Sequence, residues 1–124
     1  MTSTLTAEQR KFVQSYLGEY GASRKLLRLE NYENQFFGGA PYSEPDIDIL
    51  SETPFARAKM YGVRHFILSI KNSDEKLFLY YRYVKGEPME RCAELLGMSP
   101  RSVYRLQARA LATAYRLLVG QSTV

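Results

Sequence analysis

The sequence is poor in residue types on which several classes of protein depend. Its 124 residues include one cysteine, one histidine and no tryptophan. A single cysteine excludes an internal disulfide and a cysteine-based zinc site. The histidine, His65, lacks the neighbouring ligands of a metal site and the partners of a catalytic triad. We therefore expect neither a metal nor a cofactor.

Further absences bear on catalysis and location. The chain has no glycine-rich phosphate loop and no nucleophile with a base beside it, so we do not expect an enzyme. No apolar run approaches the ~20 residues of a membrane span. The first residues, MTSTLTAEQRK, contain no signal-peptide core, which predicts a cytoplasmic protein without a membrane partner.

Charge is present but unevenly distributed. The net charge is +4 and the isoelectric point is about 9.2. No Asp or Glu follows Glu94, whereas four arginines do: Arg101, Arg105, Arg109 and Arg116. Positive charge gathered in this way is expected where a protein binds phosphates, although a solvated helix face can show the same pattern.

The spacing of apolar residues predicts an all-α fold, because they recur at helical intervals and no segment shows a persuasive strand pattern. Thr6 and Gln9 match a capping box, which predicts a helix that starts near Ala7. Gly21 is expected to end this helix, and a second helix is predicted over residues 23–36.

Residues 1–37 would then form an N-terminal helical arm, which is a candidate for homo-oligomerisation with a dimer favoured. Its candidate dimer surface consists of Phe12, Leu17, Leu27 and Phe36. In the alternative interpretation these helices pack internally onto residues 54–70.

Residues 38–53 separate the arm from the rest of the chain. They include Pro41, Pro45 and four acids, and no Lys or Arg lies between Asn34 and Ala56. We predict an acidic linker loop here. The alternative is that Ile47, Ile49 and Leu50 hold the segment against the core.

Residues 54–124 are predicted to form a helical module. The expected helices are 54–71, 74–85, 88–96 and 100–118. The first of these is apolar around much of its circumference, so it should be sandwiched between other elements. Gly97 can close a helix in a left-handed conformation, Ser99 can cap the next helix, and Pro100 suits its first position. A helix-turn-helix is therefore predicted over residues 88–118.

Several side chains have a structural explanation from their neighbours. Cys92 fits the buried stripe of its helix as a small core residue. His65 is expected to be partly buried on the sandwiched helix. Arg82 should form a structural pair with an acid such as Glu94.

At these residues the chain resembles region 4 of sigma-70-type transcription factors. The matching elements are Arg82-Tyr83…Gly86, Ala93-Glu94-Leu95-Leu96-Gly97, Ser99 and Arg109-Ala110-Leu111, within roughly residues 74–118. The resemblance implies a C-terminal bundle that carries the helix-turn-helix, double-stranded DNA as a partner, and RNA polymerase as a second one. By its length and layout the whole chain looks similar to phage-encoded late transcription regulators of the ArpU/RinA type.

The candidate DNA-binding residues are those that project away from the buried stripe of helix 100–118, together with one residue of the preceding helix. They are Ser99, Arg101, Ser102, Tyr104, Arg105, Arg109 and Arg91. Arg101 and Arg105 are four residues apart and could reach guanine in the major groove. Ser99, Ser102, Arg109 and Arg91 are assigned to phosphates, while Tyr104 could contact DNA or rest on the neighbouring helix.

The sequence therefore predicts a sequence-specific DNA-binding transcriptional regulator. Two other classes stay open. One is a DNA-packaging adaptor similar to small phage terminase subunits. The other is an interaction module that binds polymerase without binding DNA.

Overall fold

The computed structural model describes residues 5–37 and 47–122, with side chains described for residues 5–29 and 54–120. Within those ranges the chain is helical and contains no strand, so the all-α prediction is confirmed. The elements are α1 (Ala7–Phe37), α2 (Ile47–Leu68), α3 (Ser73–Leu79), the π-helical turn η1 (Tyr80–Val84), α4 (Met89–Leu96) and α5 (Pro100–Ser122).

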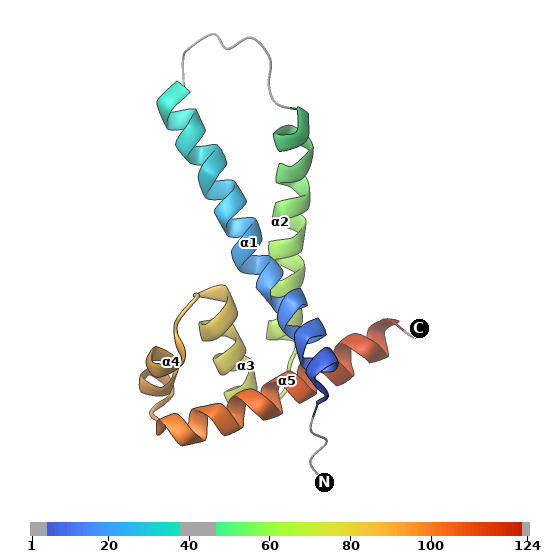
Figure 1. The fold of residues 1–124 in the computed structure, drawn as a ribbon, viewed down its shortest axis with the longest axis vertical. Coiled ribbons are helices and arrows are strands. Elements are labelled where there is room, and N and C mark those ends of the chain that lie inside the picture. The colour runs from blue at the N-terminus through green and yellow to red at the C-terminus, as the bar shows by residue number, and fades with distance from the viewer. Residues whose placement is uncertain (1–4, 38–46, 123–124) are drawn as a thin grey trace.

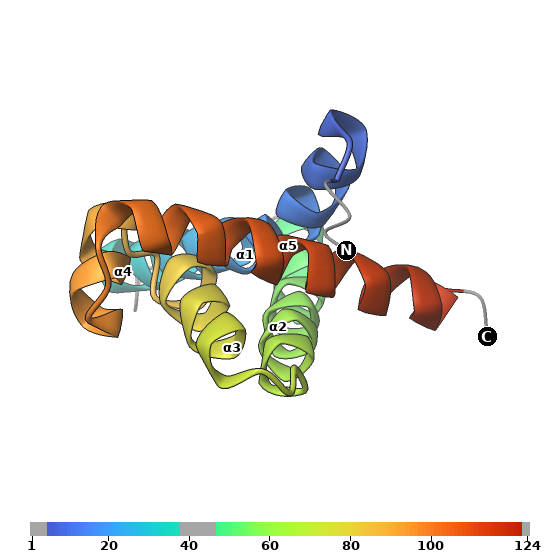
Figure 2. The ribbon, with the colours of Figure 1, turned by 90° about the horizontal axis from the view of Figure 1, so that it is seen from below.

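The helices form two groups that share one base. Helices α1 and α2 lie side by side as a long pair, while α3 and α4 lie beside the lower part of this pair (Figure 1). Helix α5 crosses the base and contacts α1, α3 and α4, and its C-terminal end extends past α2 (Figure 2). The last helix therefore connects the long α1–α2 pair with α3 and α4.

Helix α1 begins where the capping box predicted. The Thr6 backbone N–H donates to Gln9 Oε1 over 2.9 Å, and the Gln9 backbone N–H donates to Thr6 Oγ1 over 3.1 Å. The predicted break at Gly21 is wrong, because one helix runs through it to Phe37. Glycine costs a helix about 1 kcal/mol relative to alanine, which packing against α2 offsets.

The candidate dimer surface on this helix is only partly accessible. Leu17 is fully buried in the core, so it is not available to a second copy. Phe12 is exposed and Leu27 is half-buried. The side chain of Phe36 lies outside the described residues.

Helix α2 begins before the position expected from Pro54. It starts at Ile47 and includes Pro54, so the predicted loop 38–53 is wrong for residues 47–53. Residues 38–46, with Pro41, lie outside the described residues. A proline preceded by threonine is a common helix start, but proline also occurs inside a helix when other contacts compensate for the lost hydrogen bond.

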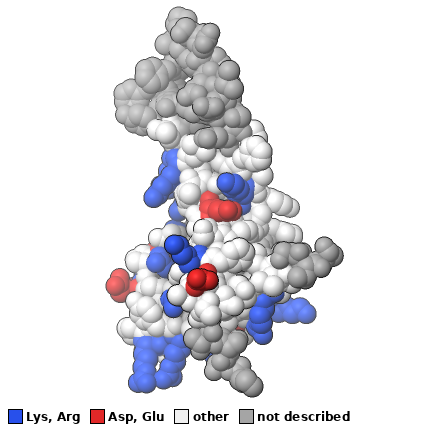
Figure 3. All heavy atoms as spheres, turned by 45° about the vertical axis from the view of Figure 1, so that its right-hand side comes forward, with Lys and Arg blue, Asp and Glu red and all other residues white. Residues whose placement is uncertain are grey.

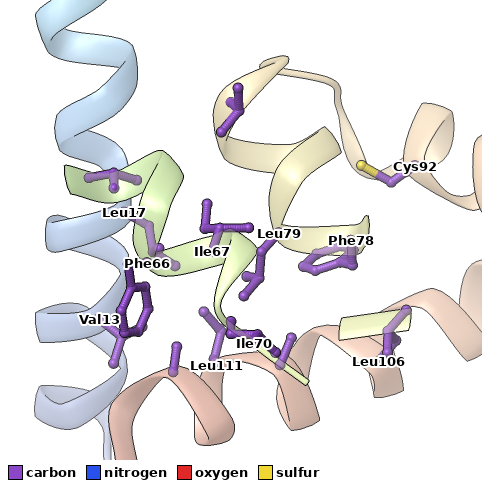
Figure 4. Packing of buried hydrophobic residues seen from close by; sticks show 14 of the residues in the cluster. Val13, Leu17, Phe66, Ile67, Ile70, Phe78, Leu79, Cys92, Leu106 and Leu111 are labelled. Carbon is purple, nitrogen blue, oxygen red and sulfur yellow. The ribbon is translucent and has the colours of Figure 1, made fainter. Parts of the chain in front are cut away.

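One hydrophobic core joins all the helices. Val13 and Leu17 of α1 lie against Phe66 and Ile67 of α2, beside the side chain of Leu111 from α5 (Figure 4). Other fully or nearly fully buried members include Val63, Ile70, Phe78, Leu79, Val84, Cys92, Ala93, Val103, Leu106, Ala110 and Ala114. The core extends from α1 and α2 into the α3–α5 group without interruption.

A π-helical turn links α3 to the segment before α4. Asn72 caps α3, because its side-chain oxygen accepts from the Glu75 backbone N–H over 3.0 Å. The Lys85 N–H donates to the Tyr80 carbonyl, a separation of five residues that defines the π turn. Gly86 follows with φ 71°, a conformation that favours glycine.

Of the structural roles predicted for Cys92, His65 and Arg82, only the first is confirmed. Cys92 is buried and unpaired with another cysteine, as predicted. His65 is exposed and stacks on the ring of Tyr61, so its predicted partial burial is wrong. Arg82 donates to the Glu87 carbonyl over 3.1 Å rather than pairing with Glu94.

None of the helices in the described part of the chain combines the length and the apolar character that a membrane crossing requires.

Two leucines on α5 test this core directly. Leu106 is 0% exposed and Leu117 is 39% exposed. We expect Leu106→Ala to lower the free energy of unfolding by about 2–5 kcal/mol, because it leaves a cavity in the core. Leu117→Ala should cost less than about 1 kcal/mol, because much of the side chain already meets water. Urea unfolding followed by circular dichroism measures both, and equal losses would contradict this core.

Candidate nucleic-acid interface

The joint between α4 and α5 is a compact turn of three residues, Gly97 to Ser99. Gly97 ends α4 in the left-handed conformation, with φ 65° and ψ 37°. The Met98 N–H donates to the Ala93 carbonyl over 2.9 Å, and the Gly97 N–H donates to the Glu94 carbonyl over 3.2 Å. This pair of bonds is a Schellman motif, which satisfies the last carbonyls of α4.

The start of α5 is capped by a side chain. The Ser102 backbone N–H donates to Ser99 Oγ over 3.2 Å, and the Ser99 hydroxyl donates to Ser102 Oγ over 3.0 Å. Pro100 occupies the first helical position, where its missing N–H costs nothing. The direction in which α5 leaves the turn is therefore fixed by local chemistry as well as by the core.

Helix α5 has a buried face and a charged face. The buried positions are Val103, Leu106, Gln107, Ala110, Leu111 and Ala114. The exposed positions fall between them and include Arg101, Tyr104, Arg105, Ala108, Arg109 and Arg116. Helical geometry therefore aligns the arginines along the side of α5 that points away from the core.

Three of the four arginines of this face are not engaged by other described residues, whereas Arg116 donates to Thr113 Oγ1 over 3.2 Å. Among the described residues, no hydrogen bond or ion pair involves the guanidinium groups of Arg101, Arg105 or Arg109. Lys and Arg side chains project from the lower end of the molecule, where Figure 1 places α5 (Figure 3). No acid follows Glu94 in the sequence, so this helix carries no negative side chain of its own.

Two other candidates lie at the edge of this face. Arg91 on α4 is exposed, but its guanidinium pairs with Glu94 over 2.9 Å. A phosphate would have to compete with that carboxylate, so Arg91 is a weaker candidate than the arginines of α5. Tyr104 is 56% exposed, which leaves most of its ring available beside Arg101 and Arg105.

All seven predicted residues thus lie on the exposed surface of α4, the turn and α5. Arg116 lies on the same face but is not among the predicted residues. Its spacing from Arg101 and Arg105 would have placed it there. The hydroxyls of Ser99 and Ser102 are partly occupied by the cap, which reduces their capacity for a phosphate.

Polar contacts from α1 hold this group of helices in place, and the sequence did not reveal them. Arg10 donates to Gln107 Oε1 over 3.2 Å, and Gln9 Nε2 donates to the Tyr115 hydroxyl oxygen over 3.3 Å. Arg24 donates to the carbonyl of Val84 over 3.0 Å. The first two contacts join residues about a hundred positions apart, and no local pattern predicts such a pair.

Two titratable groups, one in α4 and one in η1, have raised pKa values. Burial raises the pKa of the Cys92 thiol, which donates to the Glu87 carbonyl. Burial also raises the pKa of Tyr83, an effect that the nearby Arg82 and a hydrogen bond to Gln14 partly offset. A neutral buried thiol is a poor nucleophile and a poor metal ligand.

No group of three or more His, Cys, Asp or Glu side chains in the described residues could hold a metal ion.

Comparisons of this chain with protein families, with curated proteins and with solved structures found no match.

Gly97 provides a test of the turn, and Gly18 is a matched control. Neither glycine has an atom within 4 Å of the Cβ that alanine would add. Gly97→Ala should cost about 1 kcal/mol of unfolding free energy, because φ +65° is unfavourable for an L-residue. Gly18→Ala, in a helix with ordinary φ, should stabilise by up to about 1 kcal/mol. Thermal melting of both variants measures whether each substitution raises or lowers the stability. Stabilisation by Gly97→Ala would rule out the left-handed cap.

Proposed function

We propose that this protein is a sequence-specific DNA-binding transcriptional regulator, with α4, the Gly97–Ser99 turn and α5 as a helix-turn-helix. The observation that carries the proposal is the exposed face of α5. It presents Arg101, Arg105 and Arg109 without an intramolecular partner within the described residues. Unpaired guanidinium groups on a fixed helix bind phosphates and guanine without first breaking an internal pair.

The position of these arginines along α5 divides their roles. Arg101 and Arg105 lie in the first two turns, the part of a recognition helix that meets base edges in the major groove. A bidentate guanidinium contact with guanine O6 and N7 contributes ~1–3 kcal/mol of base discrimination. Arg109 lies one turn further along and suits a backbone phosphate. Ala108, small and exposed, leaves space for the helix to approach the groove.

The class of regulator rests on the resemblance to sigma region 4. That resemblance covers the α3–α5 group and adds RNA polymerase as a second partner. One recognition helix contacts only a few base pairs. A dimer would place two recognition helices ~34 Å apart on the DNA and so read a longer site. Phe12 remains exposed on α1 for such an interface, whereas Leu17 is buried.

The first test is selection of bound duplexes from a random DNA pool at two salt concentrations, followed by sequencing. We expect one enriched motif and a steep fall in affinity with salt. Salt-dependent binding without any motif would favour the packaging adaptor. Absence of DNA binding with retained polymerase binding would replace the proposal with the interaction module.

Two arginine variants test the division of roles on the selected site. Arg105→Ala should weaken the specific complex by ~1–3 kcal/mol and relax base preference at one position. Arg109→Ala should weaken binding to all sequences alike and lower the salt slope by ~1. Fluorescence anisotropy on specific and random duplexes measures both effects.

Arg28→Ala is the matched control, because Arg28 is an exposed arginine on α1. It should leave the specific complex unchanged. If all three variants behaved alike, α5 would not be the reading helix.

A further inference from the structure

The outer side of α2 is an apolar stripe that no described helix covers. Ala58, Tyr61, His65 and Leu68 follow one another at intervals of three and four residues, and all are exposed. Phe55 flanks the stripe. Phe55 is 69% exposed, Tyr61 is 72% exposed and Leu68 is 48% exposed, which is unusual for side chains of this size.

The aromatic part of the stripe is ordered by stacking. The rings of Tyr61 and His65 are 5.8 Å apart between centroids and nearly parallel, with an interplanar angle of 7°. Because they are one helical turn apart, they form a flat platform along the helix. A partner that binds there loses little side-chain entropy from these two residues.

A basic row of two arginines runs along one edge of this stripe. Arg57 and Arg64 are seven residues apart on α2, so they lie on the same side of the stripe, and both are exposed. Lys71, three residues after the end of α2, is also exposed. No Asp or Glu occurs between Thr53 and Ser73. Arg57 and Arg64 are separated by about 10 Å along the helix axis.

This arrangement matches one type of occupant. An amphipathic helix of similar length would place apolar side chains on the stripe and acidic ones along the basic row. At the edges of paired helices, opposite charges select the partner and its orientation.

A second copy of this chain fits the stripe poorly. In an antiparallel pair, Arg57 and Arg64 would face the same two arginines of the other copy. In a parallel pair they would face the edge that carries Phe55 and Gly62, which supply no acid. The missing carboxylates must therefore come from a different chain.

We propose that the outer face of α2, formed by Phe55, Tyr61 and Leu68 with the basic row of Arg57 and Arg64, is a docking surface for an acidic amphipathic helix of a partner protein. The surface lies on a different helix from the arginine face of α5 and does not depend on DNA binding. It gives the protein a second contact that is separate from the proposed recognition helix.

The test uses two synthetic amphipathic peptides of about 20 residues. Both carry leucines at the a and d positions of each heptad. The e and g positions beside them are all Glu in one peptide and all Lys in the other. We expect the Glu peptide to bind the full-length protein about tenfold more tightly than the Lys peptide or better, because four or more charges change sign. Amide chemical shifts in a nitrogen-15 NMR spectrum should change along residues 54–71.

Variants locate the binding site. The double variant Tyr61→Ser, Leu68→Ser and the single variant Arg64→Glu should each weaken the Glu peptide about tenfold. Their circular dichroism should stay native, since all three side chains are exposed. The matched controls are Tyr104→Ser and Arg105→Glu, an exposed tyrosine and an exposed arginine on α5, which should leave peptide affinity unchanged.

Three outcomes overturn the proposal. Equal binding of the Glu and Lys peptides would remove the role of the basic row. Loss of binding in Arg105→Glu with retention in Arg64→Glu would place the peptide on α5, where it imitates DNA. A self-association in sedimentation that Tyr61→Ser, Leu68→Ser abolishes would make a second copy the occupant. None of these outcomes depends on whether the protein binds DNA.

Discussion

Burial of the inner face of α5 is the constraint on which the other helices depend. Leu106 and Leu111 occupy the centre of the core, and α5 contacts α1, α3 and α4. Because a helix has a fixed period, burial of this stripe also fixes which side chains face outward. The exposed arginines are therefore placed by the core rather than by contacts of their own. A change that rotated α5 about its own axis would therefore move Arg101 and Arg105 together.

The features that the sequence predicted are those with a local cause. The capping box at Thr6, the left-handed Gly97 and the serine cap of α5 each depend on a few adjacent residues. The buried stripe of α5 was also predictable, because its apolar residues recur at helical spacing and its arginines fall between them. The exposed position of the candidate site follows from the same periodicity, whereas its partner does not.

The errors share a different cause, which is the tertiary environment. Gly21 does not end α1, because the packing of α1 along α2 stabilises the helix by more than one glycine destabilises it. The apolar character of α2 predicted a sandwiched helix, yet its outer face carries exposed Phe55 and Tyr61. Periodicity counts apolar residues but does not say whether a neighbouring element is available to cover each side. The hydrogen bond from Arg10 to Gln107 joins distant parts of the chain, so no local pattern contains it.

The π-helical turn η1 has a consequence for how the chain tolerates a change in length. A π turn accommodates one residue more than the equivalent α turn, and here it lies directly before the segment that leads to α4. Deletion of one residue there would convert the π turn into a regular α turn and leave the segment that follows in nearly the same place. The same deletion within a regular helix such as α5 would rotate everything that follows by about 100°. The turn should therefore tolerate the loss of one residue better than the other helices, because Val84 would stay in the core with its carbonyl near Arg24.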